Sequence, residues 1–185
     1  MGIVGLALVA GVIIGLARGG RLSRLAAVRL RLAPLILIGL LVQIALFSTP
    51  LAEGVGDAGP PLYVLSTALV CLALLANLHL PGLPLMAVGA LANLAAIVAN
   101  GGIMPTSPAA AGAAGLSYGE GFSNSRVIPD PALWPLTDLF AIPAGLPLAN
   151  VFSLGDLLIG IGLVWAIGAA MAGDGSARPE DPEVR

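Results

Sequence analysis

The sequence predicts an all-α, polytopic transmembrane helical bundle, and three observations lead to this fold class. The 185 residues are 58% hydrophobic and only 10% charged, with a mean hydropathy of +1.00. A soluble domain carries about 25% charged residues, so this composition excludes an ordinary soluble domain. The apolar residues also fall into runs of about 16 to 20, the length that a helix needs to cross about 30 Å of hydrocarbon. Finally, the arginines gather between the first two runs.

That arginine cluster orients the chain. It holds five of the eight basic residues, and lysine is absent. Its members are Arg18, Arg21, Arg24, Arg29 and Arg31. The positive-inside rule places such a short loop in the cytoplasm, which puts the N-terminus outside. A basic face for nucleic acid does not sit between two membrane spans, so nucleic-acid binding is excluded.

Five spans follow from the apolar runs and the turns between them. They cover approximately residues 2–17, 32–49, 62–78, 85–99 and 151–171. Together they form a single integral membrane domain over residues 1–172, with a long outer loop at 100–150 that contains short interfacial helices. Residues 173–185 are rich in proline and acid, and we expect a disordered cytoplasmic tail.

The first span is expected to be retained rather than removed as a signal. Its arginines follow the apolar run instead of preceding it, and no small-x-small cleavage site comes before Arg18. Ala7, Gly11 and Gly15 form a stripe of small residues along this helix. Such a stripe allows another helix backbone to approach closely, so we expect it to pack against a neighbouring helix.

The outer loop carries two local patterns. Ser107 before Pro108 predicts an N-cap with proline at the first helical position, and Gly115 predicts the end of this short alanine-rich helix. The stretch 133–143 is too apolar for an exposed loop and too short to cross. It predicts an interfacial or re-entrant piece with Trp134 and Phe140 at headgroup depth.

Polar residues recur on one face of two spans. Ser66 and Asn77 share a face in the third span, and Asn93 and Asn100 share one in the fourth. One interpretation is hydrogen bonding between helices. The other is a hydrated cavity that opens outward, because Asn100 leads into Gly101 and Gly102. Paired glycines there would allow a turn with positive φ and exposed N–H groups.

Two aspartates are the candidate catalytic residues. Asp156 lies about one turn inside the last span. Because a charged side chain is costly at that depth, Asp156 is a functional candidate. It is equally explained as a first-turn cap together with Ser153. Asp138 lies in the apolar interfacial piece at a similar expected depth. If the two carboxyl groups approached within about 3 Å they would share a proton and could act as acid and base. Asn124 and Arg126 are the candidates to orient them.

The segments 136–140 and 153–162 resemble the two aspartate motifs of lipoprotein signal peptidase, the type II enzyme. The resemblance implies that Asp138 and Asp156 form its catalytic dyad, and it makes Asn100-Gly101-Gly102 similar to that family's N-x-G element. Ser153 and Gly155 stand where the second motif has asparagine and alanine.

More of the chain resembles a family of small multi-pass bacterial membrane proteins of unknown function. The resemblance runs from Gly19-Gly20-Arg21-Leu22 through Asn100-Gly101-Gly102-x-Met104-Pro105 to Ser153-x-Gly155-Asp156. It implies a location in the bacterial plasma membrane and supplies no activity.

Three functional hypotheses stay open at this point. They are a structural or assembly role, an aspartyl hydrolase at the outer leaflet, and transport of a small solute or ion. Transport would use the asparagine faces and Asp156, and it requires a polar path that links Gln43, Asn77 and Asn93 across the bilayer. The chain has one histidine, His79, and one cysteine, Cys71. This inventory predicts neither a metal site nor a cofactor. The expected partner is the lipid bilayer, with other membrane subunits or a second copy of the chain as open alternatives.

Overall fold

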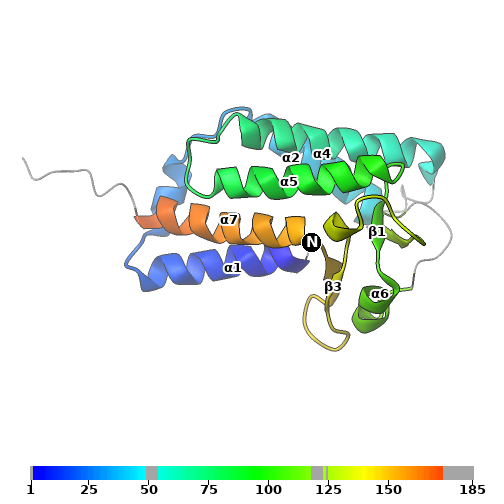
Figure 1. Ribbon diagram of the computed structural model, residues 1–185. Helices are drawn as coiled ribbons and strands as arrows, with labels where there is room; N and C mark the ends of the chain where they lie inside the picture. The colour runs from blue at the N-terminus through cyan, green and yellow to red at the C-terminus, as the bar shows by residue number, and fades with distance from the viewer. Residues whose placement is uncertain (1, 49–53, 118–122, 124, 173–185) are drawn as a thin grey trace, which may run out of the picture.

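The computed structural model describes residues 2–48, 54–117, 123 and 125–172, and five long helices form its body (Figure 1). These are α1 (Gly2–Ala17), α2 (Ala33–Ser48), α4 (Gly59–Leu75), α5 (Leu83–Ala99) and α7 (Leu154–Ala172). The mostly helical fold is confirmed. The predicted tail, 173–185, lies outside the described residues.

The long helices pack in an order that differs from their order along the chain. α1 packs against α7, α7 against α5, α5 against α4, and α4 against α2. Glycines permit the closest of these approaches. A Cβ added at Gly155 would lie 2.6 Å from the Gly89 carbonyl oxygen, and one at Gly162 would lie 2.6 Å from the Gly82 carbonyl oxygen. The α5–α7 crossing therefore depends on the absence of side chains at these positions.

The small-residue stripe of α1 packs as predicted. Ala7, Gly11 and Gly15 are all buried. A Cβ at Gly11 would lie 3.0 Å from the Cβ of Ile167, and one at Gly15 would lie 2.5 Å from the sulfur of Met171. The stripe is thus filled by side chains of α7.

Two of the helical segments are long and apolar enough to cross a membrane. One is Leu154–Ala172, and the other is Gly56–Leu75, which joins the 3-10 turn η2 (Gly56–Ala58) to α4. The helices α1, α2 and α5 are apolar but shorter. The boundary at Gly59 lies three residues before the predicted one because Pro60 and Pro61 occupy the first turn, where proline is tolerated.

The predicted outer loop contains β-structure that the all-α expectation missed. β1 (Met104–Thr106) pairs in parallel with β2 (Ser125–Val127), and β3 (Phe140–Ile142) pairs antiparallel with β4 (Asn150–Phe152). Each strand has three residues, which is too short for an alternating pattern to be recognised in a sequence. The predicted fifth span, 151–171, accordingly begins later, at Leu154. We call the described residues of 100–152 the cap.

The predicted short helix after Ser107 and the predicted interfacial piece at 133–143 both lie in the cap. The helix α6 (Pro108–Ala114) is confirmed: the Ser107 hydroxyl accepts a hydrogen bond from the Ala110 N–H at 3.1 Å, and Gly115 ends the helix with a φ of +66°. The stretch 133–143 is not a single re-entrant piece. It divides into a 3-10 turn, η3 (Trp134–Leu136), an extended segment and β3. The backbone groups of this stretch bond to other residues of the cap, through the β3–β4 pair and through the bond of the Asp138 N–H to the Pro105 carbonyl.

The arginine loop closes the opposite end of the helices from the cap (Figure 1). Its 3-10 turn, η1 (Leu22–Ala27), packs on α7. The Arg24 side chain donates to the carbonyl of Met171 at 3.0 Å and also to that of Ala172. A cation at this position satisfies free carbonyl groups and the negative end of the α7 dipole. Five of the eight arginines thus lie at the end of the bundle opposite the cap.

Candidate functional site

Asp156 begins α7 in a capping box. Its backbone N–H donates to the Ser153 hydroxyl at 3.0 Å, and the Ser153 N–H donates back to Asp156 Oδ2 at 3.1 Å. This reciprocal arrangement satisfies two N–H groups of the helix start and places the carboxylate at the positive end of the dipole. The capping interpretation of Asp156 is therefore confirmed, and it leaves the other carboxylate oxygen for a different partner.

That partner is Asn93 of α5. Its Nδ2 donates to Asp156 Oδ1 at 2.8 Å, and its Oδ1 accepts from the Ser153 hydroxyl at 2.8 Å. The amide reaches both residues because Gly155 has no side chain at the crossing; an added Cβ would clash with the Asn93 side chain. Asn93, Ser153 and Asp156 thus form one closed hydrogen-bonded unit that joins α5 to α7.

Asp138 is buried in the cap, with 5% of its surface exposed. Its N–H donates to the Pro105 carbonyl at 2.9 Å, and its carbonyl accepts from the Ser107 N–H at 3.0 Å. This bridge extends the β1–β2 pair by one more segment. The Ser125 hydroxyl donates to Asp138 Oδ2 at 3.3 Å. The side chain is therefore enclosed by the strand segments that position it.

The surroundings of Asp138 favour its protonated form. Burial, and after it the negative charge of Asp156, raise the pKa of this carboxyl to about 7, although hydrogen bonds from Ser125 and Thr106 act to lower it. The charge of Asp156 is therefore near enough to act on the Asp138 carboxyl. At neutral pH the Asp138 carboxyl can take up or release a proton.

The predicted binding residues at the end of α5 hold the cap in place. Asn100 Nδ2 donates to the Ala132 carbonyl at 2.9 Å, and the Ala132 N–H donates to Asn100 Oδ1 at 2.9 Å. Gly101 and Gly102 have the expected positive φ values, +72° and +84°. Their N–H groups donate to carbonyls of the last turn of α5 and are not presented to a ligand. Gly102 also packs against Pro60, leaving no room for a Cβ.

Asn77 makes the same kind of clamp at the other end of the bundle. Its Oδ1 accepts from the Arg31 N–H at 2.8 Å, and its Nδ2 donates to the Arg31 carbonyl at 2.8 Å. Gln43 instead donates to the Thr67 hydroxyl at 3.3 Å. The polar residues Gln43, Asn77 and Asn93 therefore bond to separate partners, and no described contact joins them into a path across the bundle.

Two predicted site residues remain. Arg126 is exposed on β2, opposite Pro105, and Asn124 lies outside the described residues. Sequence reasoning missed Ser125 and Thr106, whose hydroxyls bond to Asp138. No pattern distinguishes them from other hydroxyl residues of the outer segment, because both depend on strand pairing. Within the described part of the chain, no three His, Cys, Asp or Glu side chains gather as a metal site would require.

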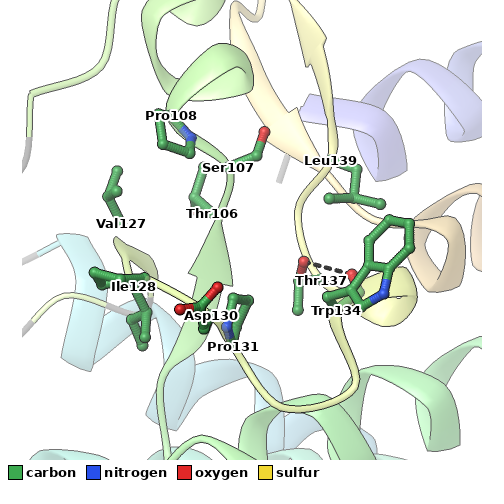
Figure 2. A pocket seen from close by; sticks show the side chains of 11 residues that line it. Thr106, Ser107, Pro108, Val127, Ile128, Asp130, Pro131, Trp134, Thr137 and Leu139 are labelled. Atoms are coloured by element: carbon green, nitrogen blue, oxygen red, sulfur yellow. Dashed lines mark hydrogen bonds between the residues drawn. The ribbon is translucent and has the colours of Figure 1, made fainter.

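A groove of about 560 Å³ opens on the cap beside the buried carboxyl (Figure 2). Figure 2 shows Val127 and Ile128 on one side and Trp134 and Leu139 on the other. Thr106 lines this groove and also hydrogen-bonds to Asp138. Thr106 therefore contacts both the groove and the buried carboxyl.

Asp130, which lines the groove, and Leu133, which precedes the lining residue Trp134, have left-handed backbone. Asp130 and Leu133 have φ values of +47° and +53°, in the left-handed region that side chains with a Cβ rarely adopt. Such outliers are found preferentially where a site requires them. Leu32 and Leu148 adopt the same conformation away from the groove, so it does not by itself mark a binding site.

Comparisons with known proteins identify a family but no activity. Neither the curated proteins nor the solved structures give a match. The resemblance of the aspartate segments to lipoprotein signal peptidase receives no support from them. The sequence pattern of DUF5317, a family of unknown function, matches residues 27–168. This match covers most of the chain and includes both aspartates and the asparagines that bond to the cap and to Asp156. The chain belongs to this family of unknown function.

Proposed function

We propose that the protein is a multi-pass integral protein of the bacterial plasma membrane, with five spans and its N-terminus outside. The observation that carries this proposal is the outward orientation of large apolar side chains on every long helix. Leu8, Leu37, Leu65, Val88 and Ile161, one from each, are all at least half exposed. A soluble monomer rarely exposes a contiguous apolar surface of this extent, whereas lipid would cover it.

Charge placement supports the same proposal. The helices α2, α4 and α5 contain no Asp, Glu, Lys or Arg, and α7 contains only Asp156, in its first turn. The five arginines lie at the end opposite the cap. Helices of 16 or 17 residues rise about 24 to 26 Å, so α1, α2 and α5 would cross upright or in thinned lipid.

Alkaline carbonate extraction tests this assignment. We expect the full-length chain to remain in the membrane pellet and to need detergent for release. Recovery of the chain in the aqueous supernatant would contradict the proposal.

Within this protein, the cap would dock onto the outer end of α5 through Asn100, while the unit formed by Asn93, Ser153 and Asp156 joins α5 to α7. The primary role that follows is structural or in assembly, with a proton-binding carboxyl, Asp138, beneath a surface groove. This interpretation uses every bond of Asp156 and does not require a substrate.

Hydrolysis is the second candidate, because Asp156 raises the pKa of a buried neighbouring carboxyl. In this hypothesis the protonated Asp138 carboxyl polarises a substrate carbonyl, and Asp156 acts as the base that takes a proton from the attacking water. Asp156 then gives this proton to the leaving group as the scissile bond breaks. The test is cleavage of a fluorogenic lipopeptide by the purified full-length protein. Asp138→Asn and Asp156→Asn should each abolish cleavage. Asp130→Asn, at the groove, should leave cleavage unchanged because it keeps both candidate catalytic residues. Cleavage that survives both replacements would remove the hypothesis.

A further inference from the structure

A second groove runs along the outer surface of the α1–α7 pair. Its volume is about 750 Å³. The small residues Ala10, Gly160 and Gly168 line it together with the larger Ile14 and Trp165. A Cβ added at Gly168 would meet nothing within 4 Å, so the space beside this residue is open. The groove is therefore apolar and accessible along the edge of the bundle, where α1 lies against α7 (Figure 1).

A cation stands at the arginine-loop end of this groove. Arg18 lines it, and its side chain is exposed. Within the described residues, no hydrogen bond or ion pair involves the Arg18 side chain, whereas Arg24 is bonded to the carbonyls at the end of α7. A guanidinium presents several N–H donors in a planar fork that matches a phosphate group. The end of the groove is thus complementary to an anion.

The dimensions match a lipid chain. From Ile3 to Arg18, both of which line the groove, α1 rises about 22 Å. One leaflet of hydrocarbon is about 15 Å thick, half of the bilayer's core of about 30 Å. An acyl chain of the inner leaflet can therefore lie along the groove while its phosphate stays at the level of Arg18.

We propose that the α1–α7 groove binds an anionic phospholipid of the inner leaflet, with its acyl chain along Ala10, Gly160 and Gly168 and its phosphate on Arg18. This inference rests on the proposed membrane insertion. A second copy of the chain and an apolar helix of another protein are the competing occupants.

Trp165 supplies the measurement because it lines the groove and is 59% exposed. In a Trp134→Phe background, fluorescence comes from Trp165 alone. The protein is titrated in mixed micelles with brominated phosphatidylglycerol or brominated phosphatidylcholine, which quench tryptophan on contact. We expect half-maximal quenching at a mole fraction of phosphatidylglycerol about fivefold to tenfold below that of phosphatidylcholine.

Two matched pairs of variants assign the effect. Arg18→Gln should give half-maximal quenching at the same mole fraction of both lipids. Arg29→Gln, in the same loop but not at the groove, should keep the preference for phosphatidylglycerol. Gly168→Leu should fill the groove and weaken quenching by both lipids several-fold. Gly112→Leu, at another open helical glycine, should leave quenching unchanged.

The outcomes separate this inference from the proposal beneath it. A preference that survives Arg18→Gln, or quenching that survives Gly168→Leu, overturns the lipid site while carbonate-resistant membrane insertion stands. A dimer in native mass spectrometry that Gly168→Leu dissociates would assign the groove to a second copy. A helical partner that co-purifies and is lost with the same variant would assign it to another protein. Release by carbonate would overturn both proposals.

Discussion

The free energy of unfolding of the wild-type protein should fall as pH rises, and Asp138→Asn should abolish this fall. The pKa of this carboxyl is raised from 3.8 to about 7 in the folded protein, first by burial and then by the charge of Asp156. The folded protein therefore holds the proton more tightly than the unfolded chain does. The resulting stability is fully present below about pH 4 and is lost as pH rises through about 7.

The size of the effect follows from the difference between the two pKa values. Each pKa unit corresponds to about 1.36 kcal/mol, so a rise of about three units corresponds to a total of about 4 kcal/mol. The free energy of unfolding should fall by at most about 1.4 kcal/mol per pH unit between those limits. The Asp138→Asn side chain is neutral throughout and should abolish this slope.

The assay is reversible unfolding of the purified protein in micelles, followed by circular dichroism from about pH 4.5 to about pH 8. Asp130→Asn is the control, because Asp130 is an exposed carboxylate of the same cap. We expect this control to keep the wild-type slope. Equal slopes for the wild type and Asp138→Asn would refute the reasoning, because Asp138 could not then be the group that titrates.

Three further predictions concern the bonds between α5 and the cap, the packing of α5 on α7, and the effect of Asp156 on Asp138. Asn100→Ala should lower the free energy of unfolding by about 1 kcal/mol, because it removes two hydrogen bonds to the exposed Ala132 backbone, and amide exchange at Ala132 should become faster. Gly155→Ala should destabilise the protein through its contacts with Asn93, whereas Gly168→Ala should have a neutral or stabilising effect, as thermal melts would show. Asp156→Asn should lower the pKa of Asp138 by removing a nearby negative charge, which infrared titration of the carboxyl C=O band would detect.

The features that sequence predicted are those with local causes. The helices follow from uninterrupted apolar runs, and α6 follows from Ser107, Pro108 and Gly115, all within a few residues of it. The small-residue stripe on α1 likewise predicted a packed face. In each case the signal and the structure that it specifies lie in the same stretch of chain.

The features that sequence missed depend on partners distant along the chain. Nothing in the run from Met104 to Thr106 indicates that it pairs with Ser125–Val127 and bridges to Asp138. Likewise, Asn93 was recognised as a polar residue, but its bonds to Ser153 and Asp156 appear only once α5 and α7 cross. Both aspartates could be chosen as candidates from sequence, while their electrostatic coupling could not.

The most direct test of the account is the side of the membrane on which each end of the bundle lies. Single cysteines at Ser23 in the arginine loop and at Ala113 in the cap, both exposed, are placed in a Cys71→Ser background. A membrane-impermeant maleimide is then applied to intact spheroplasts and to permeabilised membranes. The account predicts that Ala113→Cys is labelled in both samples and that Ser23→Cys is labelled only after permeabilisation. Labelling of both positions in intact spheroplasts, or of Ser23→Cys alone, would contradict it.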